Sequence, residues 1–286
     1  MTSAEILQKP ADARRWTRHR QELGRRVALV PTMGALHAGH LSLIDRARVV
    51  ADHVIVSIFV NPTQFNRTED FDTYPRTTDE DLSICASHGV DAVYLPTVQT
   101  MYPEGHQTRI EPGALALQWE GAHRPGHFAG VATVVAKLLN TCVPDVAVFG
   151  AKDRQQLAVI RRTVLDLDLG VDILAAPTLR EDDGLAMSSR NRRLDPASRS
   201  AAAAISRGLD EARAMASRSD KPTEIARAAR EIISEEADEI DYVAVVDIDT
   251  FDTPDVVVDP SRCALIVAAW FGGVRLIDNI LLAGDD

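Results

Sequence analysis

Two histidines, His37 and His40, stand in a turn that directly follows a short apolar segment. Residues 27–30 (Val-Ala-Leu-Val) have the character of a buried parallel strand, and residues 31–40 read PTMGALHAGH. Residues 41–50 then carry apolar side chains at the spacing of a helix that packs on a sheet. The backbone N–H groups at such a helix N-terminus attract anions, and two imidazoles on one side of the turn add further donors. The segment therefore predicts a phosphate-binding turn.

This turn differs from the common phosphate-binding motifs. The chain contains no Gly-Lys pair and therefore no P-loop, and it contains no Gly-x-Gly and therefore no dinucleotide fingerprint. A zinc pair at His37 and His40 would need further ligands, and no cluster of cysteines or histidines supplies them. Imidazoles in such a turn can donate to phosphate oxygens, such as those of a triphosphate, and can stabilise charge that develops on a leaving pyrophosphate.

Two later segments also carry side chains suited to phosphate. Residues 150–153 (Gly-Ala-Lys-Asp) follow a strand-like segment, and their lysine can reach a phosphate as a point charge. Residues 187–190 (Met-Ser-Ser-Arg) offer two hydroxyls and a guanidinium without a competing negative charge. The Ser-Arg pattern is equally typical of an ordinary helix entry, because serine caps helices well. Taken alone, the second segment supports both interpretations.

Glutamines and valines indicate where a small organic substrate could bind. Gln64 and Gln156 follow different strand-like segments, and two uncharged amides can recognise a carboxylate and a hydroxyl without neutralising a nucleophile. Three valines, 131, 134 and 135, share one face of a predicted helix and read as core residues.

Short apolar runs alternate with helical patterns through the first part of the chain, which predicts a parallel sheet covered on both faces. The strand-like segments are residues 27–30, 53–60, 92–95, 145–149 and 171–175, and the helical ones are 41–50, 79–87, 129–141 and 155–167. We expect short strands and loops over residues 102–125. Later come a helix from Pro196, a helix around 225–233, strands at 242–248, 264–271 and 274–277, and a hairpin turn at Gly272-Gly273. The expected fold is α/β: a Rossmann-like parallel-sheet domain over residues 1–177 and a smaller C-terminal α+β domain over residues 178–286.

Composition narrows the classes of partner. The 286 residues carry a formal net charge of −11, which argues against nonspecific binding to nucleic acid or to an anionic membrane. The first residues lack an apolar signal core, and the three cysteines form no Cys-x-x-Cys pair. These features are typical of a protein of the reducing cytoplasm, so we expect a cytoplasmic protein.

The His-x-Gly-His turn resembles the signature of the nucleotidylyltransferase superfamily, and the longer string PTMGALHAGH resembles that of the pantothenate synthetases. Four further segments match that family in order: SIFVNPTQF (57–65), HFAGVATVVAKLL (127–139), GAKDRQQL (150–157) and LAMSSRNRRL (185–194). The resemblance covers essentially the whole chain. One departure is visible, because Ala151 and Arg154 stand where the family usually has glutamate and an aromatic residue.

The resemblance implies an ATP-dependent ligase that joins pantoate to β-alanine through a pantoyl adenylate and releases AMP and pyrophosphate. It implies Mg²⁺ bound with the ATP phosphates, no protein ligands for a separate metal, and a homodimer. It gives His40 the role of proton donor, with His37, Lys152 and Arg190 as further catalytic residues. The ATP contacts that it implies are Met33, Gly34, Ala35, Leu36, His37, Ala38, Gly39, His40, Gly150, Ala151, Lys152, Asp153, Leu179, Met187, Ser188, Ser189 and Arg190. The substrate contacts are Thr32, Asn61, Gln64, Val131, Val134, Val135 and Gln156.

Two alternatives remain at this point. A nucleotidyltransferase that acts on a phosphorylated acceptor would keep the nucleotide in its product, although valines and glutamines suit a small apolar hydroxy acid better than a phosphate. A non-catalytic nucleotide-binding protein with a decayed site is suggested by Ala151, but the retained histidines, lysine, serines and arginine argue against it.

Overall fold

The computed structural model describes residues 4–66 and 71–284. Its internal contacts divide the chain into two compact units. The first contains residues up to 116, 124–150 and 159–176, and the second contains 117–123, 151–158 and the chain from 177 onward. Two short segments, 117–123 and 151–158, therefore group with the C-terminal residues.

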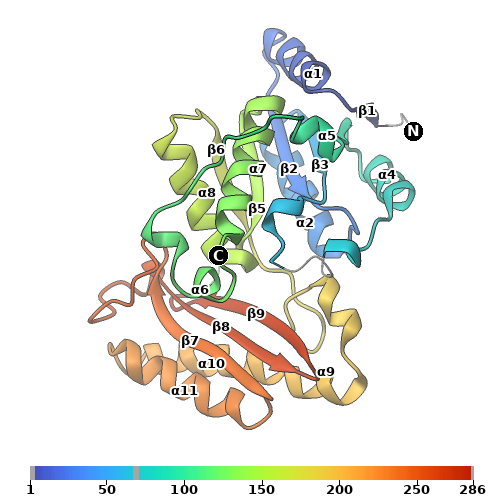
Figure 1. The fold of residues 1–286 in the computed structure, drawn as a ribbon. Helices are drawn as coiled ribbons and strands as arrows, with labels where there is room; N and C mark the ends of the chain where they lie inside the picture. Colours follow the sequence, from blue (N-terminus) through green and yellow to red (C-terminus); the bar gives the residue numbers. More distant parts are fainter. Residues whose placement is uncertain (1–3, 67–70, 285–286) are drawn as a thin grey trace. The chain divides into compact units, whose positions relative to one another are not determined.

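The first unit is built on a six-stranded parallel sheet in the order β1-β4-β3-β2-β5-β6. The strands are β1 (Glu5–Leu7), β2 (Val27–Thr32), β3 (His53–Ile58), β4 (Ala92–Tyr94), β5 (Val146–Gly150) and β6 (Asp172–Ala176). The strand order reverses at β2, whose neighbours are β3 and β5 (Figure 1). Open α/β sheets bind ligands at the carboxyl ends of strands beside such a reversal. The predicted Rossmann-like sheet is confirmed, and the histidine turn leaves the strand at the reversal.

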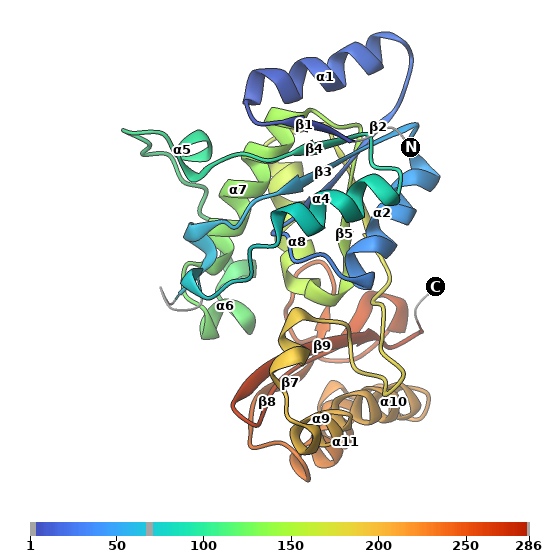
Figure 2. The ribbon, with the colours of Figure 1, turned by 90° about the vertical axis from the view of Figure 1, so that its right-hand side faces the viewer.

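Helices cover both faces of this sheet (Figure 2). They are α1 (Pro10–Glu22), α2 (Ala38–Val50), α4 (Thr78–Ser87), α5 (Val98–Met101), α7 (His127–Cys142) and α8 (Arg154–Asp166). Leu43, Ile44 and Ala47 of α2 and Cys85 of α4 share one buried cluster with alternate residues of the strands, as the period-two pattern of a strand requires. Helix α7 lies on the opposite face, and nearly all its side chains are buried.

The structure differs from the sequence-based prediction at two places in this part of the chain. Strand β1 and helix α1 were not predicted, although Pro10 at the first turn of α1 is a recognised start signal. The short strands expected within residues 102–125 are wrong, because the segment forms the 3₁₀ turn η2 (Ala114–Ala116) and the helix α6 (Glu120–His123). In this segment, backbone groups form hydrogen bonds with turns and side chains in place of a strand ladder. For example, Ile110 N–H donates to Thr133 Oγ1 at 2.9 Å.

The second unit contains an antiparallel sheet in the order β7-β8-β9. Its elements are α9 (Pro196–Ala202), α10 (Ala204–Ala216), α11 (Pro222–Ser234), β7 (Glu239–Asp247), β8 (Cys263–Phe271) and β9 (Val274–Leu281). The single helix expected from Pro196 is split between α9 and α10 at Ala203. The predicted hairpin is confirmed, since Gly272 and Gly273 both have positive φ angles, of 55° and 74°. The smaller α+β unit is thus observed.

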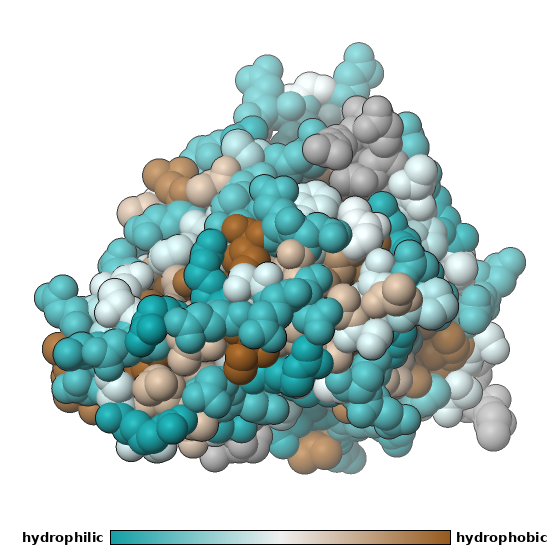
Figure 3. Space-filling model, turned by 90° about the horizontal axis from the view of Figure 1, so that it is seen from below, coloured by the Kyte–Doolittle hydropathy of each residue, from teal (hydrophilic) through white to brown (hydrophobic). Residues whose placement is uncertain are grey.

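Helices α10 and α11 pack on one face of this sheet through a shared apolar cluster. Figure 3 shows one face of the molecule, on which hydrophobic residues appear as small separate patches among hydrophilic ones. Amphipathic helices with one buried face produce such a surface. No helix in residues 4–66 or 71–284 is long and apolar enough to cross a membrane.

Candidate active site

The turn after β2 has a tightly specified backbone. Gly34 and Ala35 both adopt left-handed conformations, with φ angles of 81° and 51°. The second is costly for a residue with a Cβ atom, so the surroundings must hold it in place. Thr32, at the end of β2, contributes through its buried hydroxyl, which donates to Ser57 O at 2.8 Å and accepts from Gly34 N–H at 3.2 Å.

Asp81 of α4 is the main support of this turn. Its carboxylate accepts hydrogen bonds from Ala35 N–H at 3.0 Å, from Leu36 N–H at 2.8 Å and from the Thr77 hydroxyl at 3.2 Å. The residue is only 1% exposed, so these bonds compensate for burying its charge. The sequence predicted a helix over residues 79–87 but did not indicate this role of Asp81. A buried carboxylate that binds a loop distant in sequence leaves no local signal.

The two histidines cap the start of α2 and one another. His37 Nδ1 accepts from Gly39 N–H at 3.1 Å, and His40 Nδ1 accepts from His37 N–H at 3.3 Å. The two ring centroids are 4.1 Å apart. A nitrogen that accepts a hydrogen bond carries no proton, so each neutral ring holds its proton on Nε2. The fold thus fixes the tautomer in which Nε2 is the donor.

This arrangement changes one expectation from the sequence. Backbone N–H groups at the start of the helix were expected to attract the anion, but the imidazoles already bind those of His37 and Gly39. Asp81 binds the N–H groups of Ala35 and Leu36 just before them. Within this turn, the donors suited to a phosphate are therefore the imidazole Nε2 atoms more than those backbone groups.

Asn61 and Gln64 meet at the 3₁₀ turn η1 (Pro62–Gln64), after β3. Asn61 Nδ2 donates to Gln64 Oε1 at 3.0 Å, and Gln64 Nε2 lies 3.1 Å from Met33 Sδ. The Gln64 main-chain oxygen accepts from His127 Nδ1 at 2.8 Å and from Arg124 Nη2 at 3.2 Å. The structure thus brings three predicted site residues together in the first unit.

Helix α7 packs closely against this turn at Gly130. A Cβ atom at that position would lie 2.4 Å from Thr63 O and 2.8 Å from Gln64 N, which is too short for any contact with backbone. Asn61 Nδ2 also donates to Gly130 O at 3.2 Å. Val131, Val134 and Val135 follow on α7 and are buried, as predicted. The close approach explains why glycine stands here, which sequence reasoning did not address.

Lys152 stands in the second unit, within the 3₁₀ turn η3 (Ala151–Asp153). Asn279 of β9 donates through Nδ2 to Ala151 O at 3.0 Å and to Lys152 O at 2.8 Å. The Ala151 side chain is buried, whereas Asp153 is exposed. Gly150, the last residue of β5, belongs to the first unit.

The Met-Ser-Ser-Arg segment follows a short hairpin over residues 179–187. Met187 N–H donates to Leu179 O at 2.9 Å, and Arg180 pairs with the buried Asp278 at 2.7 Å. Burial raises the pKa of Asp278, and the charge of Arg180 and its hydrogen bonds act against that rise. The base of the hairpin is therefore anchored to β9.

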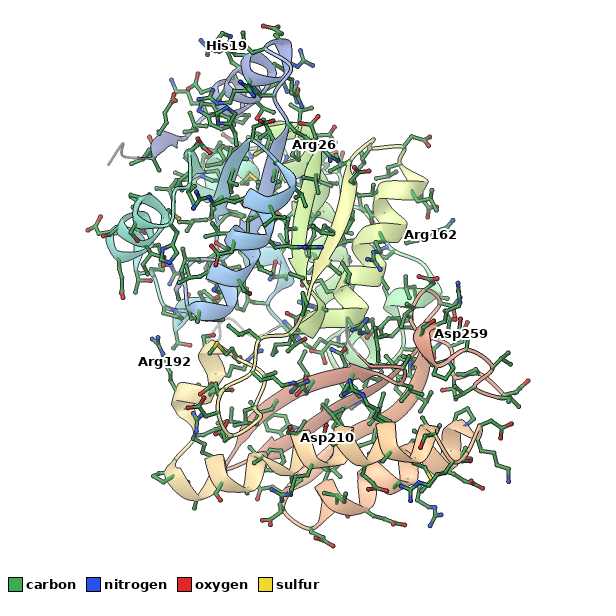
Figure 4. The ribbon with its side chains drawn as sticks, turned by 180° about the vertical axis from the view of Figure 1, so that it is seen from behind. His19, Arg26, Arg162, Arg192, Asp210 and Asp259 are labelled. Carbon is green, nitrogen blue, oxygen red and sulfur yellow. The ribbon has the colours of Figure 1, made fainter. Side chains whose placement is uncertain are left out.

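Ser188 caps the 3₁₀ turn η4 (Ser189–Arg193) by accepting from Arg190 N–H at 3.2 Å. The capping interpretation is thus confirmed, and it leaves the hydroxyl hydrogen available to donate. Lys152, Ser188 and Arg190 line one small pocket of the second unit. Arg192, two residues along, is exposed and extends outward from η4 (Figure 4). Three predicted phosphate-binding residues thus line one small pocket, together with Arg275 and Asp278, whose charges are paired with other side chains.

The predicted set is therefore divided between the units. The histidine turn, Asn61, Gln64 and the valines belong to the first unit, and Ala151–Asp153, Gln156, Leu179 and residues 187–190 belong to the second. Gln156 is half-buried in the first turn of α8.

A buried ionic cluster lies on the face of the second sheet that also carries Asn279. Arg275 pairs with Glu120 at 2.8 Å and with Asp241 at 2.6 Å, and Tyr242 donates to Glu120 at 3.2 Å. Burial tends to raise the pKa of Asp241, but the hydrogen bonds from Arg275 and Trp270 and the Arg275 charge outweigh it and lower that pKa. The cluster attaches residues 117–123 to the C-terminal sheet.

Comparison with known proteins gives one consistent result. A family model described as pantoate-beta-alanine ligase matches residues 5–281. A pantothenate synthetase of Acidothermus cellulolyticus is 54% identical over 256 residues, covering 89% of this chain and 84% of the relative.

Solved structures give the same picture. A pantothenate synthetase from Thermus thermophilus is 42% identical, with a TM-score of 0.90 over 97% of this chain and 99% of that one. A pantoate-beta-alanine ligase from Francisella tularensis, complexed with beta-gamma ATP and beta-alanine, is 35% identical, with a TM-score of 0.79 over 99% of both chains. The sequence resemblance is therefore confirmed: the chain belongs to the pantoate–β-alanine ligase family and is a ligase that forms a carbon–nitrogen bond.

Proposed function

We propose that the protein condenses pantoate with β-alanine in two steps at the expense of ATP. In the first step a pantoate carboxylate oxygen attacks the α-phosphorus of ATP, and the bond to the bridging oxygen breaks with its electron pair leaving on pyrophosphate. In the second step the β-alanine amine attacks the carbonyl carbon of the pantoyl adenylate, AMP leaves, and the nitrogen loses a proton. In each step negative charge develops on an oxygen of the leaving phosphate group, so positioning and charge stabilisation carry most of the catalysis.

The observation that carries this proposal is the fixed tautomer of the two histidines. Both Nδ1 atoms accept backbone N–H groups, so both Nε2 atoms are donors. Donors held in place before the reaction stabilise charge as it develops on a leaving pyrophosphate, with no cost of reorientation. We assign His40 as the proton donor and His37 as a second donor to the phosphates.

Lys152, Ser188, Ser189 and Arg190 complete the phosphate contacts in this proposal. Support comes from the pocket of the second unit, which the lysine, Ser188 and Arg190 line together with Asp278, whose carboxylate is paired with Arg180. Two cations and a hydroxyl suit phosphate oxygens. In this proposal Mg²⁺ enters as part of the substrate MgATP, held by the phosphates.

Pantoate is assigned to the region of Gln64 in the first unit. The Gln64 amide is held by Asn61 and faces Met33, while the buried face of α7 presents Val131 and Val134. The Gln64 amide can bind a carboxylate or a hydroxyl, and valines suit a branched apolar carbon. Neither feature favours a phosphorylated acceptor.

The proposed oligomeric state rests on the family resemblance, and the proposed cellular compartment rests on the cysteine chemistry. We propose a homodimer in the cytoplasm. The three cysteines are buried thiols, as a reducing compartment permits.

Product analysis tests the proposed reaction. The protein is incubated with MgATP, pantoate and β-alanine, and the nucleotide and acid products are separated, identified and quantified by mass spectrometry. The proposal expects pantothenate and AMP in equal amounts. ADP, or a nucleotide joined to an acceptor, would contradict it, as would the absence of turnover.

A further inference from the structure

Asn279 of β9 lies against the turn that carries Lys152. The residue is 3% exposed, and its Nδ2 donates to the two successive carbonyls of Ala151 and Lys152, at 3.0 and 2.8 Å. Its Oδ1 accepts from Nε of Arg154, the first residue of α8. One side chain therefore fixes the backbone on both sides of the lysine.

The chemistry of the three partners determines the orientation of this amide. Carbonyl oxygens only accept hydrogen bonds, and the arginine Nε only donates, so Nδ2 must face the carbonyls and Oδ1 must face Arg154. Aspartate has the same shape but no donor for the carbonyls, and leucine has neither group. Loss of the donor would remove one hydrogen bond from each of these two carbonyls, one of them that of the buried Ala151.

The fixed backbone directs the lysine side chain. Lys152 lines the same small pocket as Ser188 and Arg190, and it stands on the three-residue 3₁₀ turn that precedes α8. Asp278, the preceding residue of β9, points to the opposite face and holds Arg180 at the base of the hairpin that leads to Ser188. Adjacent residues of one strand thus support both segments of the pocket.

We propose that Asn279 is a positioning residue that holds Lys152 in place for the ATP phosphates. This inference rests on the proposed function, in which Lys152 contacts those phosphates. Asn279 itself touches the lysine backbone and acts only through it. A shift of about 1 Å in such a group costs up to ~100-fold in rate.

The test is a double-mutant cycle between Asn279 and Lys152. Asn279→Ala and Asn279→Asp are each expected to lower kcat/KM for ATP by roughly 30- to 100-fold, with the KM for pantoate changed less than about 2-fold. Asn279→Asp keeps the shape and the Arg154 contact, so it provides a folded variant if alanine destabilises the unit. Tyr242→Phe is the matched control, because it removes one buried hydrogen bond from the same sheet face without touching Lys152.

The cycle separates a positioning role from a structural one. In a Lys152→Ala background, Asn279→Ala is expected to cause little further loss, because the group that it positions is gone. An equal fold-loss with and without the lysine would overturn the inference, and so would Asn279 variants that behave like Tyr242→Phe. If Lys152→Ala alone keeps the wild-type kcat/KM, the proposed role of the lysine fails, and the inference fails with it.

Discussion

Replacing Asp81 by asparagine should disrupt the histidine turn while leaving the shape of the side chain unchanged. The carboxylate accepts Ala35 N–H and Leu36 N–H through different oxygens. An asparagine has one oxygen, so one of these N–H groups would face an NH₂ group and the other would lose its charged acceptor. Hydrogen bonds to charged groups contribute about 1.5–3 kcal/mol each. We therefore expect the free energy of unfolding to fall by about 2–4 kcal/mol.

The same change should reduce activity, because Ala35 is left-handed and the turn carries both histidines. At temperatures where the variant is folded, we expect kcat/KM for ATP to fall by about 100-fold, the cost of a shift of roughly 1 Å. The Tm should fall by roughly 10 °C. Asp79→Asn is the matched control, since it makes the same charge change at an exposed position of the same helix. An Asp81→Asn variant with the Tm and kcat/KM of Asp79→Asn would refute the reasoning.

Three further predictions follow from the geometry. Both His40→Ala and His40→Asn should lower kcat by about two to three powers of ten, because Nε2 is lost. Only the alanine variant should lose thermal stability, since an asparagine oxygen can replace Nδ1 as the acceptor of His37 N–H. Wild-type activity in either variant would exclude His40 as the donor. Gly130→Ala should raise the KM for pantoate at least ~10-fold in steady-state assays, because its Cβ would displace the backbone of Thr63 and Gln64; an unchanged KM would contradict the assignment of pantoate to Gln64. The pKa of Asp241 is lower in the fold than the usual value of about 3.9, so its contribution to stability is present above that pH and is lost as pH falls through the lower folded value. The Tm difference between the wild type and Asp241→Asn should therefore be constant above about pH 5 and shrink below about pH 4 in thermal unfolding scans, and a difference independent of pH would count against the ion pair.

The sequence predicted the features whose signals are local. The strand before the histidine turn, the helix after it and the Gly272-Gly273 hairpin all appear where periodicity and turn chemistry place them. Such features depend on residues within a few positions of one another, so a single sequence contains the needed information.

The supports of the site were not predicted, because they act across long stretches of chain. Asp81 binds a turn 45 residues earlier, and Asn279 binds a turn 127 residues earlier. Gly130 is needed only because the turn at Thr63 approaches it. No local sequence pattern around these residues indicates such partners, because only the fold brings them together. A single domain boundary at residue 177 also did not predict that residues 117–123 and 151–158 group with the C-terminal unit.

The most direct test of the two-step reaction is isotope exchange between pyrophosphate and ATP without β-alanine. The protein is incubated with MgATP, labelled pyrophosphate and pantoate, and the label recovered in ATP is measured. If a pantoyl adenylate forms first, label enters ATP when pantoate is present, and no exchange occurs when pantoate is left out. Exchange that requires β-alanine, or that proceeds without pantoate, would contradict the proposed order of steps.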